Sequence, residues 1–242
     1  MTVSKQIKYA FRLGAYWRYS VFGLVMLINI VFGGINNFGT LPNAALVTGI
    51  SLSGVGIGAV TIANLAVTIA TLQSVFGKFG YAYALAPVSR TKILFTRVVV
   101  CFVQDIIMLA ASILGLLWII FPGYGISSIP NEAVFGFIFG TVQFAVLYMF
   151  IAFNCVVEKS VLFAKKLKIG LSILCFAVFA WLFTTVDIVL SPFAIVHQAG
   201  LFFNLLLYDY RGLAAFSALA AVKIVVLFFM SRRLLEKEMN YS

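Results

Sequence analysis

Six apolar segments, each about as long as a membrane span, follow one another along the chain with shorter polar segments between them. Their approximate bounds are 19–38, 54–76, 98–121, 133–156, 169–190 and 213–230. A helix of roughly 20 apolar residues crosses the hydrocarbon core of a bilayer. The pattern therefore predicts an all-α integral membrane protein with six transmembrane helices and a single membrane domain, residues 1–242.

The segment before the first span predicts a helix that lies on the membrane surface. Residues 1–18 carry four basic side chains and no acidic one, and apolar residues recur at helical spacing among them. A basic amphipathic helix of this kind lies in the plane of the interface. We therefore expect an N-terminal amphipathic elbow helix at 1–18.

The segment between the fifth and sixth spans is too apolar for a solvated loop. Residues 191–212 are interrupted by Pro192 and Gly200, so a further span is not expected there. Irregular backbone at membrane depth is tolerated only where protein buries it. We expect an outer re-entrant helical hairpin over 191–212.

Composition and charge support this layout and orient it. Apolar residues make up 63% of the chain and charged residues 10%, which excludes an ordinary soluble domain. Fifteen of the 17 Lys and Arg residues fall in segments on one side of the predicted membrane. Basic residues near span ends face the cytoplasm, so both termini are expected to be cytoplasmic. The net charge of +10 is thereby explained by short inner loops and lipid headgroups, without nucleic acid.

The inner loop between the second and third spans, residues 77–92, contains local helix signals. Pro87 disfavours a helical conformation at Ala86, and Ser89 is a good N-cap for a helix that begins at Arg90. We expect a short amphipathic helix over about 78–86. Its aromatic and apolar side chains would either dock into a partner or lie in the headgroup layer.

Residues 86–94, Ala-Pro-Val-Ser-Arg-Thr-Lys-Ile-Leu, resemble a signature of type-2 ATP-binding-cassette (ABC) transporter permeases. That signature, Pro-Val-Ser-Arg-x-x-Ile-Leu, lies in the loop between the second and third helices of the family, and the short helix before it docks on the ATPase subunit. Residues 191–193, Ser-Pro-Phe, match the family where its outer hairpin begins. The family usually has a run with Arg and Glu ahead of the signature, whereas here Gly77–Tyr83 contains no acidic residue.

The resemblance implies the transmembrane subunit of an ATP-driven exporter in the cell membrane. It implies partnership with an ABC ATPase, which would bind ATP and Mg²⁺, and with a second permease, identical or related. This chain has no phosphate-binding loop of its own, so it is not expected to be an enzyme. The residues that the resemblance assigns to the coupling contact are Phe79, Tyr81, Tyr83, Leu85, Pro87, Ser89 and Arg90.

The expected substrate is hydrophobic or amphipathic, because the spans contain no acidic cluster and no dense polar lining. The compact chain resembles permeases that export peptides such as phenol-soluble modulins and bacteriocins. Two alternatives remain open: a substrate-binding membrane subunit of a vitamin-type importer, and a lipid or drug exporter.

Polar residues inside the second span lie on one helix face. Thr61, Asn64, Thr68 and Thr71 step by three or four residues, which places them within a stripe roughly 80° wide. Two interpretations are open. The stripe either packs against another helix through hydrogen bonds, or lines the translocation path or the subunit interface.

Three charged residues lie inside apolar segments. Lys223 is near the middle of the sixth span, and Asp105 and Asp187 are the acidic candidates to neutralise it. An unpaired charge at that depth is costly, so we expect an ion pair of Lys223 with one of the two. A substrate-facing or proton-relay role and snorkelling to the interface are the alternatives. The single histidine, His197, and the three isolated cysteines have no metal-binding spacing, so no metal site is expected.

Overall fold

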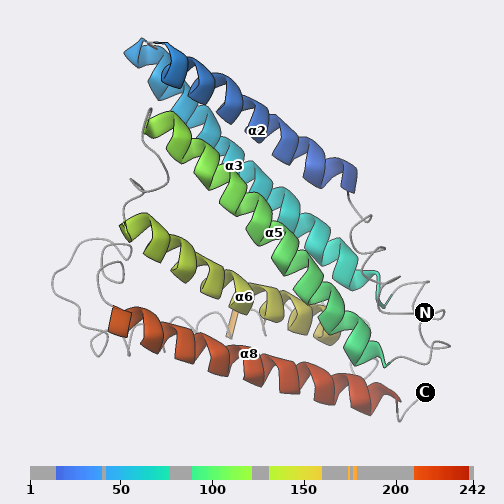
Figure 1. Ribbon diagram of the computed structural model, residues 1–242. Helices are drawn as coiled ribbons and strands as arrows, with labels where there is room; N and C mark the ends of the chain where they lie inside the picture. Colours follow the sequence, from blue (N-terminus) through green and yellow to red (C-terminus); the bar gives the residue numbers. More distant parts are fainter. Residues whose placement is uncertain are drawn as a thin grey trace. The chain divides into compact units, whose positions relative to one another are not determined.

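Five long helices form the part of the chain that the computed structural model describes, residues 15–39, 42–76, 89–121, 131–159, 174, 177–178 and 210–239. They are α2 (Ala15–Phe38), α3 (Asn43–Gln73), α5 (Arg90–Ile120), α6 (Asn131–Lys159) and α8 (Tyr210–Met239) (Figure 1). No strand occurs in these residues. Four of the helices, α2, α3, α5 and α6, are long and apolar enough to cross a membrane. This is the architecture of a multi-pass membrane protein.

Helices α2, α5 and α6 form where the hydrophobic pattern predicts the first, third and fourth spans. Helix α5 begins at Arg90, as expected, and the backbone N–H of Lys92 donates a hydrogen bond to Ser89 Oγ over 3.3 Å. Ser89 is therefore the N-cap that the sequence predicts. The helix at 78–86, most of the fifth span and the outer hairpin lie outside the described residues.

The second helix is longer than predicted, because residues 43–53 belong to it and not to a loop. Helix α3 has 31 residues, which corresponds to about 46 Å, and it begins directly after Pro42. Residues 39–53, which are uncharged and contain Pro42, were expected to connect the first two spans. Thr48 Oγ1 instead donates to the carbonyl oxygen of Ala44 over 2.8 Å, and such a bond makes a polar residue compatible with an apolar helix.

Two further boundaries differ from the prediction. Helix α2 begins at Ala15, so residues 15–18 start the first membrane helix and do not end a surface arm. Residues 1–14 lie outside the described part. Helix α8 continues beyond the predicted end of the sixth span, residue 230, to Met239. The Arg232 guanidinium pairs with Glu236 at 2.6 Å, one turn further along this helix. Such pairs at i and i+4 favour the helical state.

The described helices belong to two structural units. The first comprises α2, α3 and the greater part of α5, and the second comprises α6 and α8. Each unit has its own buried core.

Glycine permits close packing within the first unit. A Cβ atom built on Gly33 of α2 would lie 2.7 Å from the Trp118 ring of α5, and one on Gly56 of α3 would lie 2.7 Å from Val25 of α2. Membrane helices approach one another most closely where small residues face a neighbour. The same contacts fix which faces of the three helices meet.

Asparagine side chains of α2 complete the C-terminal end of α5. Asn36 Nδ2 donates to the carbonyl oxygen of Ile119 over 2.9 Å, and Asn37 Nδ2 donates to that of Trp118 over 3.1 Å. The last four carbonyls of a helix have no partner inside it. Two of these acceptors on α5 are thus satisfied by a neighbouring helix.

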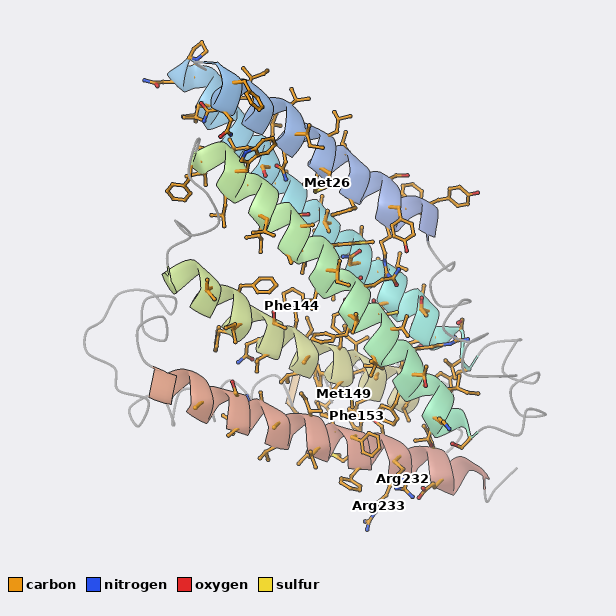
Figure 2. The ribbon with its side chains drawn as sticks, viewed as in Figure 1. Met26, Phe144, Met149, Phe153, Arg232 and Arg233 are labelled. Atoms are coloured by element: carbon orange, nitrogen blue, oxygen red, sulfur yellow. The ribbon has the colours of Figure 1, made fainter. Side chains whose placement is uncertain are left out.

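The second unit has a mostly apolar interface. Helices α6 and α8 pack against each other, and Figure 2 shows Met149 and Phe153 on the side of α6 that faces α8. The buried stripe of α8 has a spacing of three or four residues and consists of Ala220, Lys223, Leu227, Ser231 and Leu235. One helix face is therefore buried against α6, and the other remains exposed.

We expect Gly115→Ala to destabilise the protein by about 1 to 3 kcal/mol, the cost of overpacking a dense interior. A Cβ atom at this position would lie 2.9 Å from Asn29 Cβ, and Asn29 is buried and hydrogen-bonded. The matched control is Gly34→Ala, because nothing lies within 4 Å of a Cβ atom there. Thermal unfolding in detergent checks both variants. Equal melting temperatures would show that α5 can shift to make room.

Candidate functional site

A buried ion pair joins all three helices of the first unit. Arg18 of α2 lies 3.4 Å from Asp105 of α5, measured from Nη2 to Oδ1, and the side chains are 1% and 2% exposed. Arg18 Nη2 also donates to Thr68 Oγ1 of α3 over 3.4 Å, and Thr68 Oγ1 donates to Asp105 Oδ2 over 3.2 Å. A single threonine hydroxyl therefore accepts from the cation and donates to the anion.

Gln104 extends this network. Its Oε1 atom accepts a hydrogen bond from Arg18 Nη1 over 2.7 Å, and its Nε2 atom donates to Tyr19 Oη over 2.5 Å. Both ends of the amide are thus occupied. We call the five residues Arg18, Tyr19, Thr68, Gln104 and Asp105 the polar layer.

The polar layer neutralises charges that an apolar interior would otherwise exclude. A lone Arg or Asp inside a membrane span is expensive and is normally paired. Here the guanidinium and the carboxylate neutralise each other, and the neutral amide and hydroxyl groups accept or donate the additional hydrogen bonds. Because its members come from three helices, these bonds form only when α2, α3 and α5 are assembled.

A second buried cation closes the C-terminal end of α3. Arg97 Nη1 donates to the carbonyl oxygen of Thr71 over 2.9 Å and to Ser74 Oγ over 2.6 Å. The Thr71 carbonyl is among the last four of α3, where the helix dipole places partial negative charge. Arg97 therefore ties the first turns of α5 to the last turn of α3. We call this contact the Arg97 clamp.

A third polar contact lies further along the same helices. Asn29 Nδ2 donates to the carbonyl oxygen of Ser112 over 3.2 Å, and Ser53 Oγ donates to Asn29 Oδ1 over 2.6 Å. This contact again involves α2, α3 and α5. The three helices are thus held together by hydrogen bonds at several levels and not by apolar packing alone.

The predicted polar stripe of α3 is mostly a packing surface within this unit. Asn64, Thr68 and Thr71 are buried, whereas Thr61 is half-buried and its hydroxyl donates to Ile57 of its own helix. Thr71 Oγ1 likewise donates to Val67 O. Of the four residues, only Thr68 uses its side chain to bond another described helix.

Asn64 is the unsatisfied member of the stripe. Its side chain is 1% exposed, and neither Oδ1 nor Nδ2 has a hydrogen-bond partner among the described residues. Burying an unpaired amide costs about 1 to 3 kcal/mol. Asn64 is therefore the residue of the stripe that is expected to destabilise the interface.

The intramembrane charges are only partly brought together. Asp105 pairs with Arg18, a residue that the sequence had assigned to the surface arm. Lys223 is buried in the second unit, at 6% exposure. The pairing of Lys223 with an acidic residue stays a prediction, and Asp187 lies outside the described residues.

The predicted coupling residues also lie mostly beyond what the structure describes. Ser89 caps α5, and the backbone of Arg90 forms its first residue. The remaining residues, Phe79, Tyr81, Tyr83, Leu85 and Pro87, fall outside the described part. Their role stays a prediction.

Sequence reasoning missed Arg18, Gln104 and Asn29 as members of buried contacts. A signal for them exists in their spacing. Arg18, Asn29 and Asn36 are separated by eleven and seven residues on α2, and Arg97, Gln104 and Ser112 by seven and eight on α5. Intervals of seven, eight and eleven residues return to nearly the same face of a helix, so two polar faces were readable.

No protein-family model, curated protein or solved structure matches this chain. Among the described residues, no group of three His, Cys, Asp or Glu side chains is placed to hold a metal ion. The two described cysteines, Cys101 and Cys155, are buried and in the thiol form.

We expect Arg18→Met and Asp105→Leu each to cost about 3 to 5 kcal/mol, because each leaves a buried charge without its counter-ion. The double variant should lose less than the sum of the two, since it buries no charge at all. A double-mutant cycle on thermal unfolding in detergent measures this coupling. The exposed pair Arg232 and Glu236 is the control, with an expected coupling of about 0.3 to 0.5 kcal/mol. Strictly additive losses at Arg18 and Asp105 would contradict the pairing.

We expect Asn64→Leu to raise the melting temperature, because it replaces an unbonded buried amide by an apolar group of similar size. Gln104→Leu is the matched control, and it should lower the melting temperature because both ends of that amide are bonded. The same unfolding measurement checks the two variants. A fall for Asn64→Leu would mean that the Asn64 amide is satisfied by a group from outside the described helices.

Proposed function

We propose that this chain is the transmembrane subunit of an ATP-driven ABC exporter. The proposal is supported by the resemblance of residues 86–94 to the permease signature. It is also supported by the placement of that signature across the start of α5, a helix that Ser89 caps and that is apolar enough to cross a membrane. The observation that carries the proposal is the Arg97 clamp.

The Arg97 clamp would allow the inner loop to move α3 and α5 together. Residues 77–88 connect the end of α3 to the start of α5, and the clamp bonds these two helix ends to each other. A displacement applied to the loop would therefore move both helices together and would not bend either one alone. A contact of this kind would be needed to transmit a movement of the partner subunit to α3 and α5 together.

The polar layer would carry the displacement further. Arg18 connects α2 to both α3 and α5 about one to two helical turns beyond the clamp. The three helices then respond to the loop as one body. In this mechanism an ABC ATPase binds and hydrolyses ATP, and the permease performs no chemistry. It alternates between states whose populations the partner's nucleotide changes.

The proposed substrate is hydrophobic or amphipathic, with export peptides such as toxins and bacteriocins as the first class to test. In the described spans the charged groups of the polar layer are buried and internally paired. They are therefore not available to bind an ionic substrate. The complete transporter would contain a second permease, identical or related, and would lie in the cell membrane with both termini cytoplasmic.

The experiment that tests the proposal is purification from the native membrane through a C-terminal tag. We expect an ABC ATPase to co-purify and to be identified by mass spectrometry. In the double variant Tyr81→Asp, Tyr83→Asp it should be lost, because charged side chains would desolvate poorly in an apolar docking contact. The matched control is Tyr81→Phe, Tyr83→Phe, which keeps both rings and should retain the ATPase.

The possible outcomes separate two parts of the proposal. Absence of any ABC ATPase from the wild-type preparation overturns the function. Retention of the ATPase by the Asp variant leaves the exporter possible but shows that the docking contact is elsewhere.

A further inference from the structure

Helix α8 presents an exposed apolar stripe that ends in a basic residue. Val222, Val226 and Phe229 are 59%, 44% and 55% exposed, and Arg233, one turn beyond Phe229, is also exposed. The four residues step by four, three and four, which places them within about 60° on the helix surface. They lie on a face different from the buried stripe that includes Ala220, Leu227 and Leu235.

The two adjacent arginines at this end of α8 differ in their partners. Arg232 Nε lies 2.6 Å from Glu236 Oε1, so its charge is already compensated. Arg233 makes no hydrogen bond or ion pair with a described residue, and Figure 2 shows its side chain pointing away from the ribbon of α8. The uncompensated guanidinium is therefore the one in line with the apolar stripe.

The length of the stripe matches one leaflet of a bilayer. Val222 and Arg233 are eleven residues apart, or about 16 Å along a helix. Half of the hydrocarbon core is about 15 Å thick. When Arg233 lies at the headgroup level, Val222 is therefore close to the bilayer centre.

The stripe also has a fixed aromatic side chain. The rings of Phe228 and Phe229 pack edge to face, with centroids 5.5 Å apart and planes at 83°. Edge-to-face packing is favourable for aromatic pairs. The Phe229 ring is thereby held on the exposed stripe, one turn before Arg233.

We propose that Arg233 and the stripe of Val222, Val226 and Phe229 form a binding site for an anionic phospholipid. The guanidinium donates to the phosphate oxygens, for which its planar fork is well suited, and the acyl chain lies along the stripe. The stripe offers no polar group below Arg233. Its chemistry therefore complements a molecule with a single anionic end and a long apolar tail.

The test uses the full-length protein in detergent with phosphatidylglycerol or phosphatidylcholine of the same acyl chains. Lipid retained by the protein is measured by native mass spectrometry. We expect the wild type to retain phosphatidylglycerol preferentially and Arg233→Gln to bind it about fivefold more weakly, which corresponds to the about 1 kcal/mol that one basic residue contributes near an anionic surface. Inorganic phosphate at the same concentration should not displace the lipid.

Arg232→Gln is the matched control, because it removes one positive charge from the neighbouring position of the same helix. It should keep the preference for phosphatidylglycerol, and Arg233→Lys should retain most of it. Equal losses in Arg232→Gln and Arg233→Gln would overturn the site, as would equal retention of the two lipids by the wild type.

A second variant covers the case in which Arg233→Gln does not fold. Phe229→Ala removes the acyl contact but leaves the guanidinium, so it should weaken the binding of both lipids and keep the preference for the anionic one. Unchanged retention of both lipids by Phe229→Ala would overturn the proposed path of the chain.

Discussion

The ion pair between Arg18 and Asp105 is the constraint on which the three-helix unit depends. Neither charge is tolerable alone in an apolar interior, and each is neutralised only by a residue on another helix. Thr68 and Gln104 then accept hydrogen bonds from the two terminal nitrogens of the guanidinium, and Thr68 donates one to Asp105 Oδ2. Apolar packing between membrane helices has little directional preference. The charges supply that direction, because their bonds connect specific positions on α2, α3 and α5.

The other polar contacts of the unit likewise connect different helices, and they bury fewer charged groups. Asn29 and Ser53 bond each other and a backbone carbonyl, and Gly115 leaves the space in which the asparagine side chain lies. Arg97 uses the Thr71 carbonyl and the Ser74 hydroxyl at the end of α3. Each contact joins a side chain of one helix to an acceptor on another. Specific assembly thus depends on a small number of such groups along each helix.

Much of the fold was predictable from the sequence, because membrane spans are long and strongly apolar. The regions of α2, α5 and α6 follow from hydropathy, and the start of α5 follows from Ser89. The start of α3 did not follow in this way, since the second span was expected to begin only at about residue 54, whereas the helix begins at Asn43, directly after Pro42. The end of α8 was misjudged because charged residues were taken as the end of a helix, whereas Arg232 and Glu236 pair along it.

The candidate site was harder to predict, because the identity of a partner cannot be derived from one helix. The stripe of Asn64, Thr68 and Thr71 was recognised as buried or functional, but only the assembled helices show that Thr68 bonds Arg18. Arg18 and Arg97 were counted among the charges that set orientation. Both side chains are in fact buried. They contribute to internal structure, so the count of freely solvated basic residues near the span ends is smaller than the sequence indicates.

The completion of α5 by Asn36 and Asn37 has a consequence for how the chain tolerates change. The carbonyls of Trp118 and Ile119 receive their donors from α2, and that of Leu117 receives the backbone N–H of Phe121, so these three bonds do not depend on the residues that follow Phe121. A change in the length or composition of the connection after α5 would therefore leave the bonds at the end of this helix in place. An epitope tag inserted after Phe121 would leave them in place as well.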